Sequence, residues 1–242
     1  RMLSPILAFT DGKALSTRSG REFLASVAQR GVSSATVHAH ARAVRAFVRF
    51  AYDEGWIEEP VKVQMPRLEQ KRMGVLNSED VKRVLNVCGD RDRALVMTLI
   101  DSGIRRGEAL ALNWDDVDFH IGSVHVRRGK GGKARVTYVG AKSRRALLRW
   151  RAAHRSSPIF PLTASGGATL MARLSRQSGV HITFHKCRRT FATWALGGGI
   201  DLLSLQRLLG HSSLEMVRVY AQVSDAETQQ AYERTGLLDR HL

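Results

Sequence analysis

The spacing of apolar residues limits the folds that this chain can adopt. Through most of the sequence, apolar residues recur every three or four positions, which is the spacing of one buried helical face. Over residues 117–139 they alternate with other residues instead, as they do in β-strands. The alternating residues are Val117, Phe119, Ile121, Val124 and Val126, and then, after the basic glycine-rich segment 127–133, Val136 and Tyr138. The pattern predicts a mainly α-helical protein with one small antiparallel β-sheet, an α+β fold.

The helical spacing also indicates where the chain divides. A strong helix is expected after Ser33 and Ser34, which are suitable N-caps. Its apolar face consists of Val37, Ala41, Val44, Val48 and Ala51. A stretch with Pro60 and Pro66 follows, with the weak periodicity that is typical of a linker. Further helices are expected over 16–30, from Asn77 onward, over 91–102 and 106–113, and from 141 onward. We therefore expect a short helical domain at 1–66, a linker at 67–76 and a larger domain at 77–242.

Positive charge is concentrated in one part of the chain. Residues 119–200 hold 16 Lys and Arg and no Asp or Glu, whereas the whole chain has 38 basic and 22 acidic residues. This one stretch therefore carries the entire net charge of +16. A field of that sign and size is typical of a surface that binds a polyanion such as DNA.

Composition excludes several other classes of protein. The two cysteines, Cys88 and Cys187, form no CxxC pattern, which argues against a disulfide scaffold and fits the reducing cytoplasm. The sequence contains no apolar run of about 18 residues and no basic amphipathic helix, so we expect no membrane partner. Its first residues do not resemble a signal peptide. Met2 is a suitable native first residue, in which case Arg1 would be left from a tag. The alternative is that the natural protein has further residues before Arg1.

Three short segments carry the residue types that phosphoryl transfer requires. Fixed arginines can stabilise the charge that spreads over phosphate oxygens in the transition state, and a nucleophile and an acid complete the set. Arg105 lies in the first segment, SGIRRGEAL. His185 and Arg188 lie three residues apart in HKCRRTFAT, on one face of an expected helix. His211 lies in LGHSS, and Tyr220 follows it by nine residues.

A zinc site built from His185, Cys187 and His211 is the metal-binding alternative. Its spacing fits no common zinc pattern, and its basic neighbours would repel a cation. Cys187 is better explained as a small core residue. We therefore expect neither a metal nor another cofactor.

The segments SGIRRGEAL, RRGKGGKAR, HKCRRTFAT and LGHSSLEMVRVY together resemble the tyrosine recombinase (phage integrase) family. The resemblance covers about residues 33–225, and the order and intervals of the motifs all match. It implies a site-specific enzyme that cuts and rejoins DNA through a 3′-phosphotyrosyl bond. Such an ester retains the energy of the cleaved bond, so rejoining needs no ATP. Ser102, Ile104 and Cys187 depart from the residues that are usual in the family at those positions.

The resemblance implies a role for each motif residue. Arg105 and Arg188 would clamp the scissile phosphate, and His211 would donate a hydrogen bond to it. Lys130 would protonate the leaving 5′-hydroxyl, with Lys133 as the second choice. Tyr220 would attack the phosphate, with Tyr232 as the second choice, and His185 would act as general base or orient the nucleophile. Arg106 and Arg189 adjoin the two expected clamp residues and are the alternatives to them.

Double-stranded DNA is the expected partner. The residues expected to contact it are Arg42, Arg45 and Arg49 on the helix after Ser33, and Arg128, Lys133, Arg135 and Arg189. A solvated polar face is the alternative reading of the first three. The resemblance implies a homotetramer on two duplexes, with a monomer in the absence of DNA as one option. The tail 224–242 is expected to form a helix that docks on a neighbouring protomer.

Within the family, the motifs favour the integrase of a temperate phage or mobile element, acting in the cytoplasm. A Xer-type recombinase that resolves chromosome dimers is the alternative. A DNA-binding regulator that uses the fold without cleavage belongs to another class, as does a type IB topoisomerase. The full set of motif residues argues against the regulator, and the motif layout argues against the topoisomerase.

Overall fold

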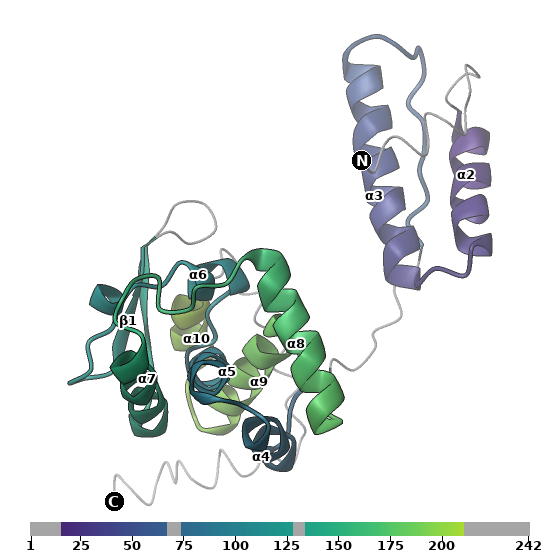
Figure 1. Cartoon of the computed structure of the whole chain (residues 1–242). Coiled ribbons are helices and arrows are strands. Elements are labelled where there is room, and N and C mark those ends of the chain that lie inside the picture. The colour runs from purple at the N-terminus through teal and green to yellow at the C-terminus, as the bar shows by residue number, and fades with distance from the viewer. Residues whose placement is uncertain (1–15, 67–73, 128–133, 211–242) are drawn as a thin grey trace, which may run out of the picture. The chain divides into compact units, whose positions relative to one another are not determined.

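The computed structural model describes residues 16–66, 74–127 and 134–210. The chain divides into two compact units, Arg1–Arg72 and Met73–Leu242 (Figure 1). Its described residues are mostly helical, with a two-stranded antiparallel sheet, so the predicted fold class is confirmed. No helix in the described parts of the chain is long and apolar enough to cross a membrane.

In the first unit, helices α2 (Thr17–Gln29) and α3 (Ser34–Asp53) pack against each other (Figure 1). Ser33 caps α3 by accepting a hydrogen bond from the backbone N–H of Thr36. The predicted apolar face of α3 is buried, and it packs against Phe23, Leu24 and Val27 of α2. The other stripe of α3, Arg42, Arg45 and Arg49, lies exposed.

The second unit is built around helix α5 (Asp90–Ser102), which other helices surround (Figure 1). The face of α5 toward α7 and that toward α9 are both covered, which explains why Leu95, Val96 and Leu99 are all fully buried. The other elements are α4 (Ser78–Asn86), α6 (Arg106–Leu110), the 3-10 turn η1 (Trp114–Asp116), β1 (Ser123–Val126), β2 (Arg135–Tyr138), α7 (Ala141–Ala153), α8 (Ala164–Ser178), α9 (Phe184–Gly197) and α10 (Leu202–Leu209).

Two predicted boundaries differ from the structure. Leu76, which we placed in the linker, is fully buried in the core of the second unit, and its backbone N–H donates to the hydroxyl of Thr190 at 2.9 Å. The helix predicted over 106–113 ends at Leu110.

The strand prediction was right for 123–126 and 135–138 and wrong for 117–121. Val117 forms only an isolated bridge with Val124, and the chain then turns. The turn forms because the Asp118 carboxylate accepts the backbone N–H groups of His120 and Ile121 at 2.7 and 3.2 Å. Ile121 is therefore a turn residue and is 63% exposed.

Strand β2 turns its polar residues inward. Val136 and Tyr138 are 38% and 54% exposed, whereas Thr137 is fully buried and the Arg135 side chain is only 8% exposed. Thr137 donates its hydroxyl to the Ser102 carbonyl at 2.8 Å, which joins the strand to the end of α5. Because side chains alternate across a strand, Arg135 points to the same side as Thr137.

Candidate active site

The end of α5 places Arg105. Gly103 has a left-handed backbone with φ of 63°, and a Cβ atom there would lie 2.2 Å from the ring of Phe191 on α9. Only glycine therefore lets the chain turn this tightly against α9. Two residues later Arg105 is the N-cap of α6, in extended conformation.

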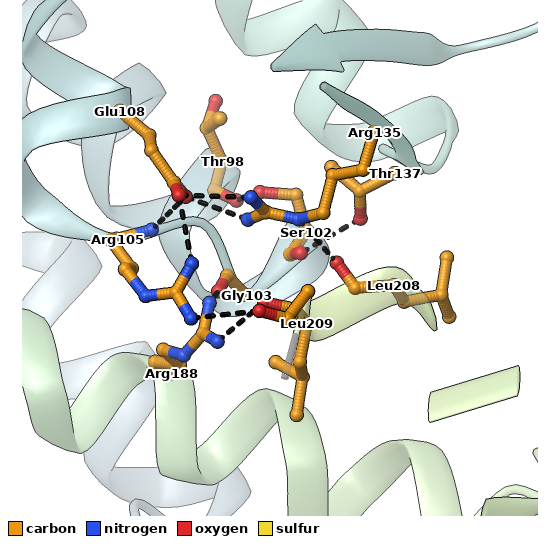
Figure 2. Close-up of polar contacts among 11 residues, drawn as sticks. Thr98, Ser102, Gly103, Arg105, Glu108, Arg135, Thr137, Arg188, Leu208 and Leu209 are labelled. Carbon is orange, nitrogen blue, oxygen red and sulfur yellow. Dashed lines mark hydrogen bonds and ion pairs between the residues drawn. The ribbon is translucent and has the colours of Figure 1, made fainter. Parts of the chain in front are cut away.

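Glu108 of α6 holds Arg105 in place (Figure 2). Its Oε2 accepts the backbone N–H of Arg105 at 2.7 Å, and its Oε1 accepts Nη1 of the same residue at 3.0 Å. The Arg105 side chain is 28% exposed. Of its five N–H groups, three have no partner among the described residues, so it can bind an anion without leaving Glu108.

Arg135 binds the other side of the same carboxylate (Figure 2). Its Nη1 and Nη2 donate to Oε1 and Oε2 of Glu108 at 2.8 and 2.6 Å. Burial alone would raise the pKa of Glu108, but the hydrogen bonds from Arg135 and Arg105 and their positive charge outweigh it and lower the pKa to about 2. Glu108 is therefore a carboxylate at any working pH.

Arg188 of α9 is buried, with only 4% of the residue exposed. Its Nη1 donates to the carbonyl of Gly103 and its Nη2 to that of Leu209 at 2.6 Å. Gly103, which accepts the first of these bonds, lies two residues before Arg105 in the chain. Arg188 and Arg105 are thus brought together by the ends of α5 and α10.

Three consecutive carbonyls at the end of α10 each accept a hydrogen bond from a different arginine, and Figure 2 labels the first two, Leu208 and Leu209. Leu208 accepts Nε of Arg135 at 2.8 Å, Leu209 accepts Arg188, and Gly210 accepts Nη2 of Arg105 at 3.1 Å. The last carbonyls of a helix have no partner within the helix and carry partial negative charge, so guanidinium groups suit them. The arginines come from three separate segments, and the end of α10 gathers them at one point.

His185 lies in the first turn of α9, three residues before Arg188, and is exposed. Partial burial lowers its pKa, and the positive charges of Arg189 and Arg188 lower it further. The imidazole is therefore mostly neutral at neutral pH and able to accept a proton. Cys187, which the zinc alternative required, is instead fully buried in the core. The described residues contain no cluster of His, Cys, Asp or Glu that could hold a metal ion.

The structure thus brings Arg105 and Arg188 together and places His185 on the helix of Arg188. It assigns Arg135 a different position from the predicted one, because this side chain is buried against Glu108 and is not a surface DNA contact. Arg189 is partly buried. Sequence reasoning assigned no role to Glu108. The predicted residues Arg128, Lys130, Lys133, His211, Tyr220 and Tyr232, and the tail 224–242, lie outside the described residues.

Comparison with known proteins identifies the family of this chain. Residues 74–227 match the model of the phage integrase family. The chain is 32% identical to the tyrosine recombinase XerA of Thermococcus kodakarensis, over 95% of this chain and 85% of that protein. It is also 32% identical to the tyrosine recombinase XerC of Oceanobacillus iheyensis, over 89% of this chain and 79% of that protein.

Among solved structures, the Tn1549 transposon integrase in complex with a circular intermediate DNA has the same fold. Its TM-score is 0.74 at 17% identity, covering 92% of this chain and 86% of that chain. A lambda integrase dimer bound to a core site gives a TM-score of 0.72 at 18% identity, covering 93% and 89%. The chain belongs to the phage integrase family, the tyrosine recombinases, as its motifs indicated.

Proposed function

We propose that this protein cuts and rejoins double-stranded DNA at a specific site, with Tyr220 as nucleophile and a 3′-phosphotyrosyl intermediate. The observation that carries the proposal is the meeting of Arg105 and Arg188 at the end of α10, one residue before His211. Two guanidinium groups fixed there can bind the non-bridging oxygens of a phosphate, which stabilises the charge of the transition state.

The remaining steps follow from the chemistry of the side chains. A tyrosine hydroxyl, with an ordinary pKa near 10, needs a base to lose its proton at neutral pH, and the lowered pKa of His185 suits that task. Lys130 would donate a proton to the leaving 5′-oxygen, which then departs as a hydroxyl. Rejoining reverses these steps, with the 5′-hydroxyl attacking the phosphotyrosine and Tyr220 leaving.

Two biological roles are compatible with this chemistry. The sequence motifs favour the integrase of a phage or mobile element, which joins two unlike DNA sites. The curated relatives XerA and XerC match nearly the whole chain and favour the Xer-type role, which acts on two copies of one site in a chromosome dimer. In either role we propose that four protomers act on two duplexes.

A two-site plasmid test separates these roles. The recognition duplex is first obtained by selecting, from a randomised pool, the sequences that the wild-type protein retains. A plasmid with two direct copies of that duplex, and a second plasmid with two unlike selected duplexes, are then incubated with the protein. Two product circles would support the Xer-type role, whereas exchange only between unlike selected sites would support the integrase. Binding without products would favour the non-cleaving regulator, and relaxation of supercoils without exchange would favour a topoisomerase.

The arginine stripe of α3 is expected to bind DNA phosphates. Replacing Arg42, Arg45 and Arg49 together with glutamine should weaken binding and make it less sensitive to salt. The slope of log K against log salt should fall in magnitude by about 0.9 for each phosphate that the variant no longer neutralises. Binding of a labelled duplex at several salt concentrations measures this slope.

The matched control replaces Arg18, Arg21 and Arg30, three exposed arginines of the same unit that lie on and just after α2. It removes the same charge from another surface. Equal weakening by both triple variants would mean that the α3 stripe is only a solvated face and that net charge alone acts.

A further inference from the structure

Arg135 is buried inside the second unit and makes three hydrogen bonds there. Its Nη1 and Nη2 bind the two oxygens of Glu108, and its Nε binds the carbonyl of Leu208. The side chains of Arg135 and Glu108 are 8% and 6% exposed. A guanidinium held on three sides in this way is not available to a DNA phosphate, so its charge must act within the protein.

Arg135 and Arg105 share the carboxylate of Glu108, and this sharing sets the charge that Arg105 presents to DNA. One carboxylate accepts hydrogen bonds from two guanidinium groups, those of Arg105 and Arg135. Without Arg135, the whole negative charge of Glu108 would act on Arg105 alone, and it would compete with an incoming phosphate. With Arg135 present, the three side chains keep a net positive charge, and Arg105 remains an effective cation toward DNA.

The turn after α10 is also built around Arg135. Gly210 has a left-handed backbone with φ of 64°, and a Cβ atom there would lie 2.8 Å from Cδ of Arg135. Arg135 contacts the carbonyl of Leu208, and the next two carbonyls bind Arg188 and Arg105. The position of Arg135 therefore fixes the end of α10 relative to both expected clamp residues.

We propose that Arg135 is a positioning residue for DNA cleavage. It shares Glu108 so that Arg105 keeps its charge for the phosphate, and it holds the end of α10, which leads directly into His211. Strand β2 begins at Arg135, five residues after Lys130 in the sequence. The proposal rests on the cleavage activity proposed above.

The test compares single-turnover cleavage of a nicked recognition duplex by wild type, Arg135→Gln, Arg135→Lys, Glu108→Gln and the Arg135→Gln/Glu108→Gln double variant. The control is Arg173→Gln, which removes another interhelical arginine, paired with buried Asp92 at the opposite end of α5. DNA binding and thermal unfolding of each variant are measured in parallel, and cleavage is assayed below every unfolding transition.

Arg135→Gln should slow cleavage by about 10²-fold, the effect of a small misplacement of a catalytic group. DNA binding should stay close to wild type, and Arg173→Gln should cleave normally. The cleavage rate of Arg135→Lys should lie between those of wild type and Arg135→Gln, because lysine restores the charge but not the bidentate contact with Glu108. The double variant should cleave about tenfold faster than Arg135→Gln, because no carboxylate then neutralises Arg105.

Two results would overturn the proposal. One is cleavage by Arg135→Gln at the rate of Arg173→Gln. The other is a double variant slowed by the product of the two single effects, which would mean that Arg135 does not act through Glu108. If Arg135→Gln does not fold, the double variant and Arg135→Lys, which leave no unpaired carboxylate, carry the test. If wild type itself forms no covalent complex, the proposed function fails. If wild type and Arg135→Gln cleave at the same rate, only the role of Arg135 is removed.

Discussion

Replacing Arg188 with alanine is expected to lower the rate of DNA cleavage by about 10²–10³-fold or more, because a preorganised donor to the phosphate is lost. Arg188→Lys should be nearly as slow, since an ammonium group cannot bind the Gly103 carbonyl, the Leu209 carbonyl and a phosphate oxygen in one plane. Single-turnover formation of the covalent complex measures the rate. Both variants should also unfold at lower temperature, because the two carbonyls lose their donor in a buried place.

Arg189→Ala is the matched control, since Arg189 is the next residue on the same helix and is only partly buried. It should reduce DNA affinity more than the rate of cleavage from the bound state. If Arg189→Ala abolishes cleavage and Arg188→Ala does not, the two assignments must be exchanged.

Replacing Glu108 with glutamine is expected to destabilise the second unit by about 3–5 kcal/mol, because it leaves the buried charge of Arg135 without its partner. For a unit of this size the unfolding temperature should fall by roughly 10 °C. Calorimetry or circular dichroism measures the shift. Glu79→Gln is the control, because Glu79 is 71% exposed in its ion pair with Lys82 and should change stability very little. An unfolding temperature for Glu108→Gln equal to that of the control would contradict the structure of the site.

The same ion pair predicts how stability depends on pH. The pKa of Glu108 is about 2 in the folded protein and has an ordinary value of 4.5, so the folded state favours the ionised form. Its contribution is complete above pH 4.5 and is lost as the pH falls from there toward 2, and it amounts to about 3 kcal/mol. Between pH 5 and pH 3, urea unfolding should show a loss of stability that is about 2 kcal/mol larger in wild type than in Glu108→Gln.

The local features of the fold could be predicted because they depend on neighbouring residues. The face of α3 repeats its apolar residues at helical spacing, and Ser33 and Asn77 have the side chains that cap helices. All five residues of the predicted α3 face are buried. The meeting of Arg105 and Arg188 is different, because they lie 83 positions apart in the sequence and only the family resemblance indicated it.

The partnership of Glu108 and Arg135 could not be predicted from spacing. In β2 the apolar residues Val136 and Tyr138 suggest the inward face, yet the structure buries Thr137 and Arg135. The strand faces this way because the Ser102 carbonyl, Glu108 and the end of α10 supply polar partners, and these come from distant parts of the chain. One available signal was the single acidic residue, Glu108, in the SGIRRGEAL motif, close to two arginines that it could neutralise.

The central claim is that Tyr220 attacks a phosphate held by Arg105 and Arg188. The most direct measurement uses the selected recognition duplex, nicked so that cleavage cannot be reversed, with wild type and Tyr220→Phe resolved on a denaturing gel. We predict a covalent protein–DNA band with wild type and none with Tyr220→Phe, although both proteins bind the duplex on a native gel. A band that persists with Tyr220→Phe would point to another nucleophile, with Tyr232 the first to test. Tight binding without a band from either protein would contradict the enzymatic account.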